Sequence, residues 1–204
     1  IAHRGLHTDE FDENSIGAFS NAISNGYAIE LDVRLTKDGY VVVIHDDKLD
    51  RLFGIDNKVS NMTLAELKEL RFPKSKETIP TLAETMAHIA GRTPVLIEIK
   101  NFGLAGKLEE ATLKVLEGYQ GEYAYQAFGP FSCRWMRQHD KDTPVGLLLA
   151  DLPMTGTRLF RNFKDNFFAA ISRPSFIAYN YATMNDEITK GYRDNGVTVL
   201  GWTV

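Results

Sequence analysis

The chain has 204 residues, of which 44% are hydrophobic and 25% charged, a composition typical of a globular protein with one large or two small domains. Its formal net charge of −4 leaves no broad basic surface, which argues against nucleic acid as a main partner. No apolar run approaches the ~18 residues of a membrane span, and the single Cys133 excludes an internal disulfide or a cysteine-rich metal site.

The two ends of the sequence carry little signal. It opens on "IAHRG" without a signal peptide, so we expect a cytoplasmic location without stable membrane insertion. We also expect residues before Ile1 and after Val204 in the natural protein, because no helix follows the last strand-like run.

Eight apolar runs along the chain are predicted to be strands. They are Ile1–His3, Ala28–Val33, Tyr40–His45, Pro94–Lys100, Glu122–Phe128, Pro144–Leu149, Ser175–Asn180 and Val197–Val204. Helical patterns stand between most of them, at 14–26, 63–70, 81–92, 104–118 and 185–196. This alternation predicts an α/β fold, and eight strands favour a (β/α)8 TIM barrel. An open doubly wound sheet is the alternative.

The connection between the second and third runs is irregular. The stretch from Asp32 to Tyr40 is too short for a helix, and "KDG" (37–39) is a turn signal. The two strands therefore form either a hairpin or an unusually tight parallel return. Both arrangements bring His45 close to Asp32.

Ionisable residues gather at the carboxyl ends of the first four runs. They are His3, Arg4, Glu30, Asp32, His45, Asp46, Glu98 and Lys100. In a (β/α)8 barrel this end of the strands is the catalytic face, so we expect one site there.

Three of these residues, Glu30, Asp32 and Glu98, are carboxylates that would repel one another in a concave site. A divalent cation would remove that repulsion, and an all-oxygen ligand set suits Ca²⁺ or Mg²⁺. The cations Arg4 and Lys100 beside such a metal would bind an anion, for which phosphate is the obvious candidate.

The two histidines, His3 and His45, complete the candidate site. Histidine is the side chain that titrates nearest neutral pH, so the pair can serve as general acid and base. The residues alone therefore predict metal-assisted chemistry on a phosphate ester.

The chain resembles the glycerophosphodiester phosphodiesterase family along nearly its whole length. The matching pieces are "AHRG" (2–5), "ENS" (13–15), "GYAIELDVRLTKDG" (26–39), "VVVIHDDKLDR" (41–51), "IPTLAE" (79–84), "LIEIK" (96–100) and "GVTVLGWTV" (196–204). The resemblance implies a barrel of the phospholipase C-like phosphodiesterase type, formed by residues 1–204 as a single domain. A small insertion would lie at about 46–92, and the last helix would be absent.

The resemblance also implies hydrolysis of small-molecule glycerophosphodiesters to glycerol 3-phosphate and an alcohol. Catalytic roles would fall to His3 and His45, and divalent metal binding to Glu30, Asp32 and Glu98. Substrate binding would fall to Arg4, Lys100, Glu13, Asn14, Gln126 and Trp202. Among the departures from the family pattern, Ala127 stands where a serine is often found, which leaves Gln126 to shape the pocket.

Two other functions stay open. Related barrels act as lysophospholipase D or sphingomyelinase D-like enzymes on lipids, and a binding protein could keep the metal site without catalysis. The intact His3, Arg4, His45 and Lys100 argue against the binding protein. The alcohol, the choice between Ca²⁺ and Mg²⁺ and the oligomeric state are not predicted.

Overall fold

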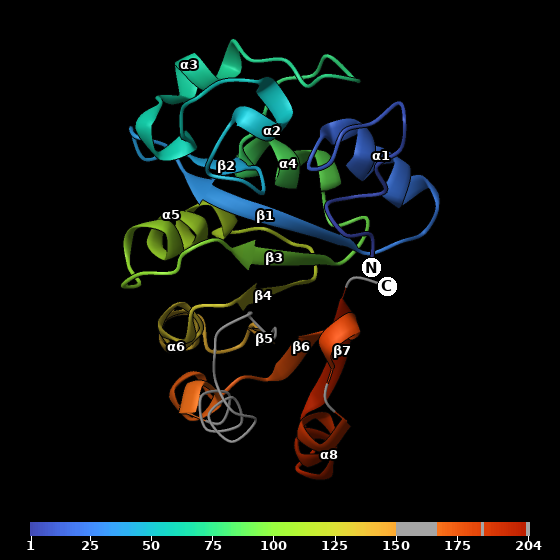
Figure 1. Cartoon of the computed structure of the whole chain (residues 1–204), viewed down its shortest axis with the longest axis vertical. Helices are drawn as coiled ribbons and strands as arrows, with labels where there is room; N and C mark the ends of the chain where they lie inside the picture. Colours follow the sequence, from blue (N-terminus) through green and yellow to red (C-terminus); the bar gives the residue numbers. More distant parts are fainter. Residues whose placement is uncertain (150–166, 185, 203–204) are drawn as a thin grey trace. The chain divides into compact units, whose positions relative to one another are not determined.

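The computed structural model describes residues 1–149, 167–184 and 186–202. These residues divide into two compact units. One consists of Ile1–Lys100 and Gly106–Tyr123, and the other of Asn101–Ala105 and Ala124–Val204. Strands and helices alternate along the chain in both units, as expected for an α/β protein (Figure 1).

Three strands form the sheet of the first unit, in the order β2-β1-β3. They are β1 (Ile29–Leu35), β2 (Val41–Val43) and β3 (Val95–Ile99). The central strand β1, in blue in Figure 1, is parallel to β3 and antiparallel to β2. Both faces of β1 are buried over its first five residues, so its charged residues are buried as well.

The helices of this unit are α1 (Ile16–Ser24), α2 (Asp50–Phe53), α3 (Leu64–Lys68), α4 (Leu82–Ile89) and α5 (Lys107–Leu116), with the 3-10 helix η1 (Val59–Asn61). Two of these helices begin with a capping box. Thr63 and Glu66 cap α3, and Thr81 and Glu84 cap α4, each pair bonding reciprocally to backbone amides.

A hairpin joins β1 to β2, so of the two predicted arrangements the hairpin is correct. Gly39 has φ 88 in its turn, and the Thr36 amide donates to the Tyr40 carbonyl at 2.9 Å. The register pairs Val33 with Val43, and the Ile44 amide donates to the Asp32 carbonyl at 2.9 Å. His45 therefore follows directly beside Asp32.

The first predicted strand, Ile1–His3, is largely wrong. Only Ala2 pairs with β1, through a single parallel bridge to Ile29. The chain then leaves the sheet because Arg4 and Gly5 adopt left-handed conformations, with φ 59 and φ 79. Gly5 also packs tightly, since a Cβ there would lie 2.9 Å from the Ala18 Cβ. Seven strands remain among the described residues.

The segment 46–92, predicted as an insertion, holds α2, η1, α3 and α4. Much of it packs on a small apolar core made of Val42, Ile44, Leu49, Val59, Leu67, Phe72 and Ile79. Burial of these side chains holds the short helices in place, because helices of four or five residues are not stable alone.

The second unit is built on four parallel strands in the order β4-β5-β6-β7. They are β4 (Tyr123–Ala127), β5 (Val145–Leu149), β6 (Phe176–Asn180) and β7 (Thr198–Trp202). The helices are α6 (Pro130–His139), η2 (Tyr181–Thr183), α8 (Asp186–Asp194) and residues 167–172. The last two residues of the predicted strand Val197–Val204 lie outside the described residues. Among the described helices, none is both long and apolar enough to cross a bilayer.

Candidate active site

Three buried carboxylates meet on the sheet of the first unit. Glu30 and Asp32 are two residues apart on β1, so they share a face, and Glu98 pairs with Asp32 across the β1–β3 ladder. One ligand oxygen from each lies within 4.8 Å of those of the other two. The structure thus brings together the three residues that the sequence predicts as metal ligands.

Burial controls the protonation of this cluster. It raises the pKa of Glu98 to about 7, and together with the charges of Asp32 and Glu98 it raises the pKa of Glu30 well above its usual value. Burial also acts on Asp32, but the Lys100 ammonium, His45 and the Asn14 amide together outweigh it and lower the pKa of Asp32. Without a cation, the cluster therefore retains protons near neutral pH.

The donor set fits a hard divalent cation. Asp32 Oδ1 and Glu98 Oε1 are buried and accept no hydrogen bond of regular geometry. Each instead contacts the Lys100 ammonium, at 3.0 Å and 2.5 Å. Oxygen-only coordination by carboxylates is what Ca²⁺ and Mg²⁺ prefer.

Arg4 lies beside the carboxylates because of its unusual backbone. Its amide donates to Glu30 Oε2 at 2.9 Å, and its guanidinium donates to Glu13 Oε1 at 2.9 Å. The Arg4 Nε is 3.6 Å from Asp32 Oδ2. A left-handed non-glycine residue is strained, and such strain is common where a side chain must be aimed at a ligand.

Asn14 fixes Asp32 from the other side. Asn14 is buried in a left-handed conformation with φ 56, and its backbone amide donates to the Arg4 carbonyl at 2.9 Å. Its Nδ2 donates to Asp32 Oδ2 at 2.8 Å, and its Oδ1 accepts from the Asp32 amide at 3.3 Å. This double contact sets the orientation of the Asp32 carboxylate.

Both predicted catalytic histidines lie near this cluster. His3 is in the turn after the Ala2 bridge, and burial and the charge of Arg4 lower its pKa. His45 follows β2, and its Nδ1 lies 2.6 Å from Asp46 Oδ1. Burial lowers the pKa of His45 as well, so both imidazoles are neutral and able to accept a proton near pH 7.

Two further predicted residues belong to the second unit. Gln126 is buried on β4, and Trp202 ends β7. The Trp202 Nε1 donates to the Ala178 carbonyl at 3.1 Å, and its ring meets Phe128 edge-on with centroids 5.7 Å apart. The role of Gln126 and Trp202 in substrate binding stays a prediction.

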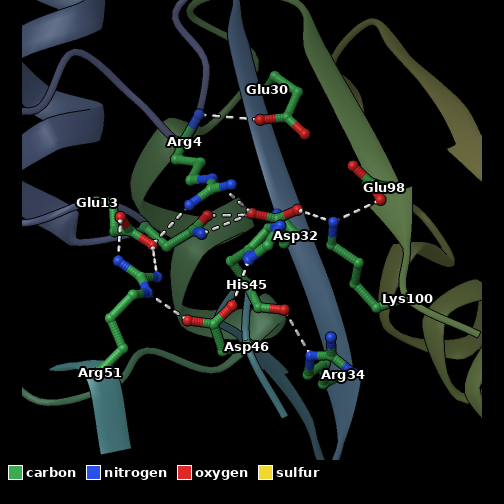
Figure 2. Close-up of polar contacts among 11 residues, drawn as sticks. Arg4, Glu13, Glu30, Asp32, Arg34, His45, Asp46, Arg51, Glu98 and Lys100 are labelled. Carbon is green, nitrogen blue, oxygen red and sulfur yellow. Dashed lines mark hydrogen bonds and ion pairs between the residues drawn. The ribbon is translucent and has the colours of Figure 1, made fainter. Parts of the chain in front are cut away.

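The structure adds residues to which the sequence reading gave no role. Figure 2 shows Asp46 and Arg51 in a chain of polar contacts that continues to Glu13 and Arg4. Arg34 reaches the same loop, since its Nε donates to the His45 carbonyl at 2.7 Å. In the sequence, Arg34, Asp46 and Arg51 are marked out only by lying in the two matching pieces that contain Asp32 and His45.

Comparison with known proteins agrees with this geometry. The family model described as "Glycerophosphoryl diester phosphodiesterase family" matches residues 3–204. The chain is 32% identical to a glycerophosphodiester phosphodiesterase of Caldanaerobacter subterraneus subsp. tengcongensis, an alignment that covers 100% of this chain and 84% of the relative.

Solved structures show the same likeness. A glycerophosphodiester phosphodiesterase of Thermotoga maritima aligns with a TM-score of 0.77 at 29% identity, covering 100% of this chain and 84% of the other. A phosphodiesterase of Oleispira antarctica, solved with the product sn-glycerol 3-phosphate, aligns with a TM-score of 0.85 at 23% identity. This alignment covers 100% of this chain and 83% of the other. The predicted α/β barrel fold is confirmed by these likenesses. The chain belongs to the glycerophosphoryl diester phosphodiesterase family, whose members are enzymes that hydrolyse phosphoric diesters.

Proposed function

We propose that this enzyme is a metal-dependent glycerophosphodiesterase that releases glycerol 3-phosphate and an alcohol by histidine acid/base catalysis. The observation that carries the proposal is the convergence of Glu30, Asp32 and Glu98 within 4.8 Å, beside two cationic side chains. The product bound to the Oleispira antarctica phosphodiesterase supports glycerol 3-phosphate as the product here.

Each group has a distinct task in this proposal. A divalent cation held by the three carboxylates would supply positive charge against the phosphate oxygens. Arg4 and Lys100 lie beside that cluster and would bind the remaining phosphate charge. A cation held there would share the neutralisation of Asp32 and Glu98, which Lys100 now contacts, and would leave the Lys100 ammonium available to the substrate.

The two histidines would move the protons. One neutral imidazole would accept a proton from the water or substrate hydroxyl that forms a new bond to phosphorus. The other imidazole, in its protonated form, would donate a proton to the alcohol oxygen as its bond to phosphorus breaks, and a substrate hydroxyl that had attacked would then be displaced by water. The contact of His45 Nδ1 with Asp46 favours the tautomer in which Nδ1 carries the hydrogen, which leaves Nε2 free to accept. His3 would then supply the second proton.

The activity is tested by measuring glycerol 3-phosphate released from glycerophosphocholine and glycerophosphoethanolamine. The protein is assayed after EDTA treatment and again after Ca²⁺ or Mg²⁺ is added back. We expect EDTA to abolish release and one ion to restore it. Unchanged release in EDTA would contradict metal dependence, and no release with either ion would contradict the activity on these esters. Release of choline from lysophosphatidylcholine alone would instead assign a lipid phosphodiesterase.

A further inference from the structure

Arg51, on the short helix α2, joins two carboxylates that come from different parts of the chain. Its Nη1 and Nη2 donate to the two oxygens of Glu13, at 3.0 Å and 2.5 Å. Its Nε donates to Asp46 Oδ2 at 2.5 Å. Three of the donors of one planar guanidinium are therefore used in fixed directions, which an ammonium could not reproduce.

Each of these carboxylates in turn contacts a residue of the proposed machinery. Glu13 Oε1 also accepts from the Arg4 guanidinium at 2.9 Å, and Asp46 Oδ1 meets His45 Nδ1 at 2.6 Å. A continuous chain of polar contacts thus runs from His45 through Arg51 to Arg4, as the dashed lines of Figure 2 show.

The backbone that carries Arg51 is firmly held. The preceding Leu49 is fully buried in the apolar core of the 42–79 segment, and Phe53 packs on Phe72 with ring centroids 5.5 Å apart. Gly54 ends the helix in a left-handed conformation, and its amide donates to the Asp50 carbonyl. Arg51 therefore projects from a fixed base toward two acceptors.

A plain surface ion pair is the competing explanation. The Arg51 side chain is 46% exposed, and exposed pairs contribute little to stability. An ion pair that only stabilised the fold, however, would not need carboxylates that also contact Arg4 and His45, the residues proposed to bind phosphate and to transfer a proton. Burial raises the pKa of Glu13 and Asp46, but the hydrogen bonds and charge of Arg51 outweigh it together with those of Arg4 at Glu13 and of His45 at Asp46. The net effect lowers the pKa of each carboxyl, so both stay ionised and keep their acceptor roles.

We propose that Arg51 is a positioning residue that holds Glu13 and Asp46, and through them Arg4 and His45, in the geometry needed for phosphodiester hydrolysis. The inference rests on the proposed function, in which Arg4 binds phosphate and His45 transfers a proton. Because Arg51 touches neither directly in the described structure, its effect is carried by the two carboxylates.

The first test compares Arg51→Met with Arg51→Lys and Arg71→Met in the full chain with the restoring ion. Methionine removes the donors while keeping much of the side-chain bulk. We expect a loss of about 10- to 100-fold in kcat and a rise in KM, since partners that orient reacting groups carry effects of this size. Lysine should restore only part of the activity. Arg71 is the matched control, because it is exposed on the same segment and, among the described residues, donates only to the Lys68 and Leu70 carbonyls.

A double-mutant cycle separates positioning from stability. The fold-loss of kcat caused by Arg51→Met should be at least about five times smaller in an Asp46→Asn background than in the parent. The reason is that Asp46→Asn has already broken the path to His45. KM should still rise in that background, because the path through Glu13 to Arg4 remains. Equal kcat losses in the two backgrounds would overturn the proposal, as would an Arg51→Met enzyme as active as Arg71→Met.

A measurement independent of turnover completes the test. His45 is surrounded by Asp46, Asp32, Lys100, Arg4 and His3, and the hydrogen bond to Asp46 raises its pKa. If Arg51 holds Asp46 in place, Arg51→Met should lower the pKa of His45 measured by NMR, because the hydrogen bond to Asp46 is lost, and Arg71→Met should not. A raised pKa would show that only the Arg51 charge was removed while Asp46 stayed in place, and would contradict the positioning role. An unchanged pKa would contradict the linkage to His45. If the parent enzyme releases no product, the proposed function fails, while this titration still decides whether Arg51 governs His45.

Discussion

The Lys100 ammonium lies 2.5 Å from Glu98 Oε1, inside a side-chain environment that is almost closed to water. The same ammonium is 3.0 Å from Asp32 Oδ1, so it neutralises two of the three carboxylates that are proposed as metal ligands. A divalent cation at this site would therefore interact with the same carboxylates as Lys100. The effect of Lys100 on metal binding can be measured in a variant that lacks its ammonium.

Replacing Lys100 with methionine should separate metal binding from catalysis. The metal-free variant should lose about 3 kcal/mol of unfolding free energy, because Asp32 Oδ1 and Glu98 Oε1 lose the buried ammonium that contacts them. Ca²⁺ or Mg²⁺ should then raise its melting temperature more than that of the parent, while glycerol 3-phosphate release falls. Calorimetry and melting curves check this, with the exposed Lys114→Met as control. A smaller metal-induced shift in Lys100→Met would show that Lys100 assists metal binding.

The raised pKa of Glu98, about 7, predicts that its contribution to the free energy of unfolding depends on pH. Between its unfolded value near 4.5 and about 7, the folded protein binds more protons than the unfolded one, so this group makes stability fall as pH rises. Lowered pKa values of His3 and His45 act in the opposite direction, so the comparison must be made with a variant.

Glu98→Gln provides that comparison. In EDTA, the variant should gain stability relative to the parent as pH rises from 5.0 to 7.5, by at most roughly 3 kcal/mol. Urea unfolding at each pH measures the difference. A difference that does not change with pH would mean that Glu98 is ionised throughout in the folded protein. Added Ca²⁺ or Mg²⁺ should favour the parent, because the variant lacks one carboxylate.

His45→Ala and His3→Ala should each reduce kcat by about 10²- to 10⁴-fold if they are the acid/base pair. Neither should change metal affinity greatly, because no histidine is among the three candidate ligands. His7→Ala is the matched control, an exposed histidine in the loop that follows His3. Product release by His45→Ala close to that of His7→Ala would remove His45 from the mechanism.

Asn14→Asp tests the orientation of Asp32 with little change of shape. Asparagine and aspartate tolerate the left-handed φ of 56 similarly, so backbone strain is matched. The new carboxylate would face Asp32 Oδ2, which now accepts from Nδ2 at 2.8 Å, and we expect a loss of about 2 kcal/mol without metal. Asn57→Asp keeps its acceptor for the Lys58 amide and should change little. Equal melting temperatures for the two variants would rule out this electrostatic account.

The carboxylate cluster could be predicted because strand geometry is local. Alternation in "AIELDV" assigns Glu30 and Asp32 to one face, and "LIEIK" places Glu98 at the carboxyl end of another strand. The parallel register then pairs Asp32 with Glu98. The turn signal at 37–39 left a hairpin and a tight parallel return open, and either one brought His45 close to Asp32. The structure has the hairpin.

Other features depend on contacts that no local pattern encodes. The predicted first strand, Ile1–His3, is reduced to the Ala2 bridge, and the chain turns away at Arg4. The left-handed backbone of Arg4 is held by its amide contact to Glu30, 26 residues away. Arg51 and Glu13 are 38 residues apart in sequence, and a helix of four residues carries the arginine. Neither hydrophobic periodicity nor capping signals predict which exposed arginine will meet which carboxylate.

The hairpin between β1 and β2 also bears on how the site assembles during folding. Asp32 and His45 are brought together by a short-range turn, which can close within microseconds, before distant strands have paired. Glu98 joins only when β3 pairs with β1, a contact of much greater sequence separation. Nascent chains would thus acquire the histidine–aspartate pair early, and the complete three-carboxylate cluster, with its capacity to capture a cation, only once the longer loop has closed.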